Sequence, residues 1–69
     1  DKFVEVMERS LTHREYKIIC LRYGINGRRP LTQKEVSKLL RISRSYVSRI
    51  EKKAIDKIKE TVKNEKIEV

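Results

Sequence analysis

The sequence predicts a small all-α domain of about four helices with a C-terminal helix-turn-helix. Three observations support this fold class. The 69 residues contain only two glycines and one proline, two capping boxes mark helix starts, and no polar–apolar alternation lasts long enough to indicate a strand. A chain of this length forms one domain with a small core. We therefore expect a single domain over residues 1–69, with the helix-turn-helix at about residues 32–60.

The first two expected helices precede the clearest loop of the sequence. Apolar residues between positions 3 and 11 indicate a short first helix. The second begins at Thr12, which forms a capping box with Glu15, and ends at Gly24, because glycine readily takes the left-handed backbone of a helix end. An Asn-Gly pair at positions 26 and 27 and a proline at position 30 then predict a loop over residues 24–31.

The third and fourth expected helices form the helix-turn-helix. A second capping box, from Thr32 to Glu35, opens the third helix. Its inward face is expected to consist of Val36, Leu39 and Leu40. After a break at residues 41–43, a longer helix capped by Ser43 follows. The apolar stripe of this helix consists of Val47, Ile50, Ala54 and Ile58. A short capped helix, a tight turn and a longer capped helix are the parts of this motif.

The positive charge of the chain is concentrated around this motif. Eighteen Lys and Arg against ten Asp and Glu give a net charge of +8. Residues 28–59 alone contain eleven basic and three acidic residues, whereas residues 1–27 and 60–69 carry net charges of +1 and −1. Such a concentration of positive charge is typical of a protein that binds an anionic partner, most simply nucleic acid.

The outward face of the last helix suits double-stranded DNA. The major groove admits a helix, and short hydroxyls and arginines read base edges there. The residues expected to read bases are Arg44, Ser45, Ser48 and Arg49. Those beside them that are expected to contact phosphates are Tyr46, Lys52, Lys53 and Lys57. No acidic side chain interrupts this stripe, as phosphate contacts require.

Several other classes of function are excluded by composition. One cysteine and one histidine are too few for a disulfide or a structural metal site. The chain has no Ser/His/Asp or Cys/His set and no glycine-rich phosphate loop, so neither an enzyme nor a cofactor is expected. No apolar run approaches the roughly 20 residues that span a bilayer, and the first residues, DKFVE, lack the apolar stretch of a signal peptide. Because the chain begins with Asp, we expect it to be a piece of a longer protein.

Three sequence blocks, taken in order, resemble region four of bacterial sigma factors, the promoter-recognition domain of the RNA polymerase specificity subunit. The blocks are LTHREYKIICLRYGI at 11–25, LTQKEV at 31–36 and ISRSYVSRIEKKA at 42–54. The likeness covers about residues 3–60. The third block is similar to the sporulation sigma factors of endospore-forming bacteria.

The resemblance implies binding to the minus-thirty-five element of promoter DNA by the helix that begins at Ser43. Arg44 stands at the family's guanine-reading position. Ser45 and Arg49 stand where an acidic residue and a glutamine are common, so the exact hexamer stays open. Phosphate contacts implied by the resemblance are Arg14, Arg22, Thr32, Gln33, Lys34 and Lys53. Arg41 stands where many such motifs have glycine, and a positive φ there would cost on the order of 1 kcal/mol.

The resemblance also implies partners other than DNA. The family docks on RNA polymerase core through a flap of the β subunit, and an anti-sigma factor or an activator is a further partner. Residues that could line the docking cleft are Phe3, Val6, Met7, Leu21, Tyr23 and Ile25, with plain core packing as the alternative for each. The implied location is the bacterial cytoplasm, at the nucleoid.

Two other interpretations stay open at this stage. DNA-binding domains of LuxR-type response regulators share the Leu-Thr-x-Arg-Glu opening and the Ile-Ser turn, but they have a shorter link after the first helices and lack the block at residues 49–54. A protein-docking module without DNA specificity could also use the basic face. Such a module would show no preference among duplexes, whereas DNA binding falls steeply with salt and depends on sequence.

Overall fold

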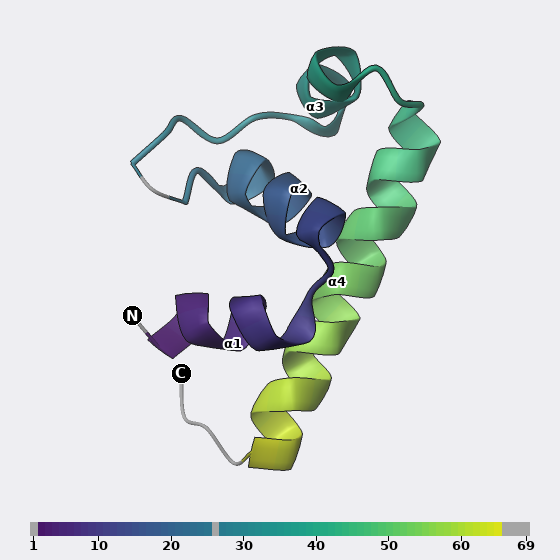
Figure 1. Cartoon of the computed structure of the whole chain (residues 1–69). Coiled ribbons are helices and arrows are strands. Elements are labelled where there is room, and N and C mark those ends of the chain that lie inside the picture. The colour runs from purple at the N-terminus through teal and green to yellow at the C-terminus, as the bar shows by residue number, and fades with distance from the viewer. Residues whose placement is uncertain (1, 26, 66–69) are drawn as a thin grey trace.

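The structure of the chain, a computed structural model, describes residues 2–25 and 27–65. All regular structure in these two ranges is helical. The helices are α1 (Lys2–Ser10), α2 (His13–Tyr23), α3 (Gln33–Leu40) and α4 (Arg44–Glu65). The last is by far the longest, and α1, α2 and α3 each pack against a different level of it (Figure 1). The predicted all-α class and the helix-turn-helix, formed by α3 and α4, are confirmed. The second helix of the motif runs past the expected end at about residue 60.

The starts of α2 and α3 are held by the predicted capping boxes. At α2 the Thr12 hydroxyl accepts from the Glu15 amide at 3.2 Å, and the Glu15 carboxylate accepts from the Thr12 amide at 2.9 Å. The equivalent distances between Thr32 and Glu35 are 3.1 and 2.8 Å. Each box satisfies two backbone N–H groups that the helix itself cannot bond. The starts of both helices are therefore specified within four residues of sequence.

The end of α2 is the predicted glycine cap. Gly24 adopts a left-handed backbone, with a φ of +66°. The amide of Ile25 donates to the carbonyl of Cys20 at 3.1 Å, which closes the helix end in the usual way. Asn26 of the predicted Asn-Gly turn lies outside the described residues.

The turn of the helix-turn-helix also uses a left-handed residue. Arg41 has a φ of +57°, and its amide donates to the carbonyl of Ser37. The positive φ considered from the sequence is therefore present. A non-glycine residue in this conformation costs on the order of 1 kcal/mol.

The core is divided into two clusters, both of which include α2 and α4. The first lies between α1, α2 and α4 and consists of Val6, Met7, Ile19, Ala54 and Ile58. The second lies between α2, α3 and α4 and consists of Ile18, Leu21, Val36, Val47 and Ile50. All four residues of the predicted apolar stripe on α4 are buried. Adjacent residues of α2, Ile18 and Ile19, join different clusters, so this helix links the α1 side of the molecule to the helix-turn-helix.

The predicted inward face of α3 is wrong at one position. Leu39 is 59% exposed, whereas Val36 is fully buried and Leu40 packs against the second cluster. The helix contacts the rest of the domain along the row through Val36 and Leu40. Leu39 lies about 100° around the helix axis from Leu40, so it points to solvent.

Among the described residues, no helix has both the length and the apolar composition needed to cross a membrane.

Candidate nucleic-acid interface

The exposed side of the first turns of α4 carries every residue predicted to read bases. Arg44, Ser45, Ser48 and Arg49 are all exposed, while Val47 between them is fully buried. The Ser43 hydroxyl accepts from the Tyr46 amide at 3.1 Å, so this residue caps the helix as predicted. The apolar stripe of α4 thus turns its serines and arginines away from the core and leaves them accessible at the end of the helix.

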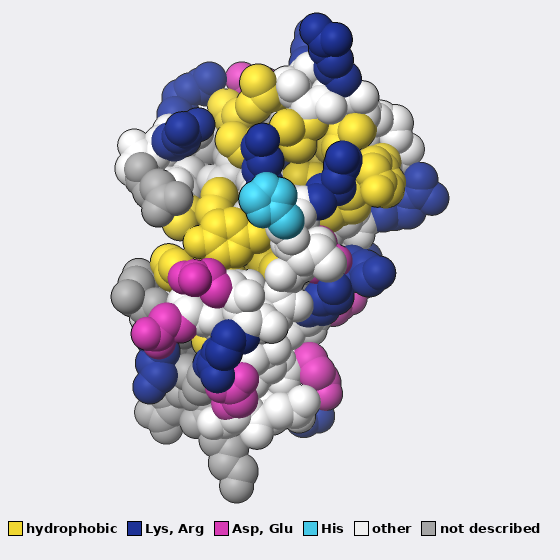
Figure 2. Space-filling view, in the orientation of Figure 1, with side chains coloured by type: hydrophobic (Ala, Val, Ile, Leu, Met, Phe, Trp, Pro, Cys, Tyr) yellow, Lys and Arg dark blue, Asp and Glu magenta, His cyan; other side chains and the backbone are white. Residues whose placement is uncertain are grey.

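Cations flank this face on two sides. Lys53 is exposed, and the side chain of Lys52 is 81% exposed, with its Nζ 3.7 Å from the Asp56 carboxylate. Most Lys and Arg side chains visible in Figure 2 lie over α2, α3 and the start of α4, whereas most acidic side chains lie lower, over α1 and the end of α4. The molecule is therefore polarised, and its basic half is the half that contains the helix-turn-helix.

A shallow hollow separates the start of α2 from the exposed face of α4. It is lined by Thr12, Arg14, Glu15, Tyr46, Arg49, Ile50 and Lys53. The Arg14 guanidinium lies 5.9 Å from the centre of the Tyr46 ring, within the range of a cation–π contact. Three cationic side chains on two helices therefore surround a concave surface next to the predicted base-reading residues.

Lys57, a predicted phosphate contact, has a half-buried side chain that is paired with a buried carboxylate. Its Nζ lies 2.8 Å from the carboxylate of Glu15, which is only 5% exposed and also caps α2. Burial by itself raises the pKa of Glu15, but the hydrogen bonds from Lys57 and from the Thr12 amide outweigh it, so the pKa is lowered below 4.5. The pair joins the start of α2 to the middle of α4. The sequence indicated the capping role of Glu15 and not this second one.

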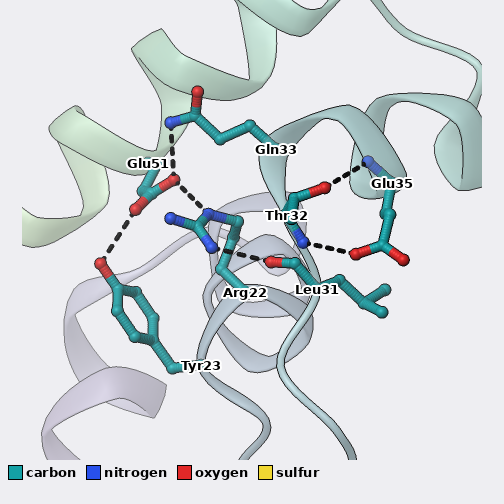
Figure 3. Close-up of polar contacts among 7 residues, drawn as sticks. All are labelled: Arg22, Tyr23, Leu31, Thr32, Gln33, Glu35 and Glu51. Carbon is teal, nitrogen blue, oxygen red and sulfur yellow. Dashed lines mark hydrogen bonds and ion pairs between the residues drawn. The ribbon is translucent and has the colours of Figure 1, made fainter.

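A second buried carboxylate, Glu51, is bonded to the end of α2 and the start of α3 (Figure 3). It is 7% exposed. Its Oε1 accepts from Nε of Arg22 at 2.8 Å and from Nε2 of Gln33 at 3.0 Å, and its Oε2 accepts from the hydroxyl of Tyr23 at 2.9 Å. Burial raises the pKa of Glu51, but these three hydrogen bonds and the charge of Arg22 outweigh that effect and lower it below 4.5. The bond to Glu51 in turn raises the pKa of Tyr23.

Arg22 extends this network to the connection before α3. Its Nη1 donates to the carbonyl of Leu31 at 2.7 Å, and the Leu31 amide donates to the carbonyl of Leu21 at 3.0 Å. Arg22 and Gln33 were predicted to contact phosphates, but the structure directs these donors to partners inside the protein. The other two residues predicted at the start of α3, Thr32 and Lys34, are exposed, although the Thr32 hydroxyl is used in the cap.

Sequence reasoning missed the role of Glu51, although a signal was present. Glu51 follows Val47 by four residues and Ile50 by one, so it falls on the edge of the apolar stripe of α4. A carboxylate at such a position is nearly always paired when it is buried. Its partners lie 18 to 29 residues away, and no local pattern identifies them.

Three residues proposed to line a docking cleft belong to the core instead. Val6, Met7 and Leu21 are at most 8% exposed, because α1 and α2 turn these side chains toward α4 and α3. Of the other three, Tyr23 is 50% exposed, while Phe3 and Ile25 are half-buried against the first cluster. They line an apolar groove together with Ile19, Ile55, Ile58 and Lys59.

In the described part of the chain, no three His, Cys, Asp or Glu residues come close enough to hold a metal ion. Cys20 is a free, half-buried cysteine, and burial raises the pKa of its thiol. Neither a metal site nor a reactive thiol is therefore added to the basic face by the described residues.

The geometry defines a DNA-binding domain of the helix-turn-helix class: a short capped helix, a tight left-handed turn, and a second helix whose exposed end carries hydroxyls and guanidiniums. Residues 9–60 match the family described as Sigma-70, region 4. The chain belongs to this family. The resemblance found in the sequence is thereby confirmed, and the LuxR-type alternative is not favoured.

Curated relatives agree with this assignment. The chain is 46% identical over 54 residues to the RNA polymerase sigma-E factor of Clostridium acetobutylicum, which covers 78% of this chain and 23% of that protein. It is 50% identical over 48 residues to the RNA polymerase sigma-K factor of Bacillus subtilis, covering 70% and 16%. The same identity and length are found with the RNA polymerase sigma-28 factor of Bacillus thuringiensis, covering 70% and 20%. The chain thus spans less than a quarter of each relative, and no solved structure gives a significant match.

Proposed function

We propose that this chain recognises the minus-thirty-five element of bacterial promoters, as the DNA-binding part of a sigma factor that directs RNA polymerase to initiate transcription. The observation that carries the proposal is the exposed end of α4, where Arg44, Ser45, Ser48 and Arg49 lie on one accessible face. In a helix-turn-helix this part of the second helix enters the major groove. Arg44 then reads guanine, and the neighbouring hydroxyls and Arg49 contact adjacent base edges.

The DNA backbone is proposed to pass over the hollow between α2 and α4. Arg14, Arg49 and Lys53 surround this hollow, and their charges favour a phosphate there. Lys34 at the exposed start of α3 and Lys52 on α4 are placed for the flanking phosphates. Thr32 accompanies them as a polar neighbour of the backbone, and Tyr46 contributes its ring, which lies beside Arg14 next to the proposed phosphate. Arg22, Gln33 and Lys57 support this surface from inside, through their bonds to buried carboxylates.

The apolar groove is proposed to receive the flap of the polymerase β subunit. Of its members, Tyr23 is exposed and Phe3 and Ile25 are half-buried, and Ile55 of α4 completes the wall. An apolar groove of this kind suits an apolar helix or loop of a partner protein. We also propose that an anti-sigma factor or an activator binds this domain, and that the parent protein acts in the bacterial cytoplasm, at the nucleoid.

The sporulation type is the proposed subfamily. The sigma-E and sigma-K names of relatives at 46% and 50% identity support it, together with the block at residues 42–54. The proposed role is regulatory and not enzymatic.

The proposal is tested by selecting bound duplexes from a random library with the 69-residue chain. Arg44→Ala is expected to weaken binding to the selected duplex by about 1–3 kcal/mol and to relax preference at one base pair, because a bidentate guanine contact is lost. Lys53→Ala is the matched control: it should weaken all duplexes alike and reduce the salt slope by about one unit.

Equal loss on every duplex with Arg44→Ala would contradict its base-reading role. A wild-type chain that selects no sequence at all would favour the docking-module interpretation instead.

A further inference from the structure

The Glu51 carboxylate connects the recognition helix to the segment that precedes it in the motif. It lies on the buried side of α4, one turn beyond Ser48. Two of its partners, Arg22 and Tyr23, are the last residues of α2, and the third, Gln33, is the first residue of α3. The connection between α2 and α3 runs between these partners. Glu51 therefore fixes both ends of that connection against the middle of α4.

The consequence for α3 is that it is held at both ends. At its C-terminal end, the tight turn at Arg41 joins it to α4. At its N-terminal end, the Gln33–Glu51 bond and the Arg22–Leu31 bond hold the residues around the cap. Without those two bonds, α3 would be fixed to α4 only by the turn and by the apolar contacts of Val36 and Leu40.

The placement of the start of α3 matters because backbone contacts set the register in which base contacts are made. In a helix-turn-helix the first helix crosses the DNA backbone while the second reads the groove. We propose that Glu51 is a positioning residue for promoter recognition, which holds the N-terminal end of α3 in register with the base-reading face of α4. This inference rests on the proposed DNA-binding function.

The charge of Glu51 adds a second effect in the same direction. Its carboxylate compensates the charge of Arg22, whose side chain is 23% exposed. When the carboxylate is neutralised, the positive charge of Arg22 has lost its partner and adds to the attraction for any phosphate backbone. Loss of register weakens the selected sequence, whereas the extra charge strengthens all sequences. A residue with only a structural role would instead weaken both in proportion to the unfolded fraction.

The test compares Glu51→Gln with Glu60→Gln in the 69-residue chain. Both substitutions remove one negative charge from α4, but Glu60 is exposed and accepts from the Asn64 side chain at a long 3.4 Å. The probes are the duplex that the wild-type chain selects from a random library and a shuffled duplex of the same composition. Glu51→Gln is expected to reduce the ratio of the two affinities by about tenfold, the scale of one lost base contact, with binding to the shuffled duplex unchanged or stronger. Glu60→Gln is expected to keep the wild-type ratio.

A second variant keeps the inference testable if Glu51→Gln does not fold, as circular dichroism would show. Arg22→Lys preserves every charge but cannot reach Glu51 and the Leu31 carbonyl together in the geometry of a guanidinium. It is expected to reduce the ratio in the same way. If a folded Glu51→Gln chain keeps the wild-type ratio of the two duplex affinities, the inference is wrong while the proposed function stands. The same holds for Arg22→Lys if Glu51→Gln does not fold. A wild-type chain without duplex preference overturns the proposed function, and the inference with it.

Discussion

Gly24 offers a sharp test of how the connection to α3 packs on the end of α2. It has a φ of +66°, and a Cβ added there would lie 2.4 Å from the carbonyl oxygen of Arg28 and 3.0 Å from the ring of Pro30. Gly27 has a similar φ of +79°, but a Cβ there would meet nothing within 4 Å. The two glycines share a positive φ and differ in their surroundings. Gly24→Ala and Gly27→Ala therefore separate the cost of the backbone from the cost of the contact.

The magnitudes follow from these two terms. Placing alanine in the left-handed region costs on the order of 1 kcal/mol in either variant. At Gly24 the new methyl group also collides with a backbone oxygen, which no side-chain rotation can relieve, and forced packing of this kind costs about 1–3 kcal/mol more. We expect Gly27→Ala to lose about 1 kcal/mol and Gly24→Ala about 2–4 kcal/mol. In a domain of this size, each kcal/mol lowers Tm by about 4–8 °C.

The assay is thermal unfolding followed by circular dichroism at 222 nm, with urea unfolding of the same proteins as a second measure of the free energy of unfolding. The loss of Tm in Gly24→Ala should be at least twice that in Gly27→Ala. Equal losses in the two variants would refute the close approach of Arg28 and Pro30 to the end of α2. The hydrogen bonds of Leu31 to Leu21 and Arg22 would then hold the connection on α2 without close packing against Gly24.

Three further predictions concern acid, the cap of α4 and the aromatic ring beside the hollow. The pKa values of Glu15 and Glu51 in the folded protein are lowered below 4.5. The stability that these carboxylates contribute is therefore complete above 4.5 and is lost as the pH falls through their folded pKa values. An acid titration followed by circular dichroism measures this loss, and undiminished stability well below 4.5 would contradict it. Ser43→Ala should lower the free energy of unfolding by about 0.5–2 kcal/mol and Ser43→Thr by less, as measured in urea. Tyr46→Phe should bind duplexes nearly as well as the wild type because the ring beside Arg14 remains, whereas Tyr46→Leu should weaken all duplexes; equal weakening in both variants would assign the contact to the hydroxyl.

The features that the sequence predicted correctly are those decided by neighbouring residues. A capping box needs only a threonine and a glutamate three residues apart, and both boxes are present with both bonds formed. The positive φ of Arg41 was considered only because many helix-turn-helix motifs have glycine at this position, and the structure has it. The apolar stripe of α4 could be predicted because a helix of 22 residues repeats its period several times.

The features that the sequence did not predict depend on contacts between distant segments. The eight-residue α3 contains only about two turns, so its apolar residues do not show how wide a face the rest of the domain buries. Leu39 lies just outside the buried face. Likewise, Val6 and Met7 are apolar whether they meet a partner protein or the protein's own α4. The two buried carboxylates find their arginine and lysine 29 and 42 residues away, and no spacing rule connects such pairs.

These ion pairs change how the charge of the domain should be related to DNA binding. The net charge of +8 counts every Lys and Arg alike, but Arg22 and Lys57 each face a carboxylate that is at most 7% exposed. A cation paired with a buried acid is expected to contribute less to counterion release when DNA binds, because part of its charge is already compensated within the protein. Arg14, Lys34 and Lys53 are exposed instead. The salt dependence of binding should therefore follow the exposed cations of α2, α3 and α4, while the paired ones determine how those helices are held together.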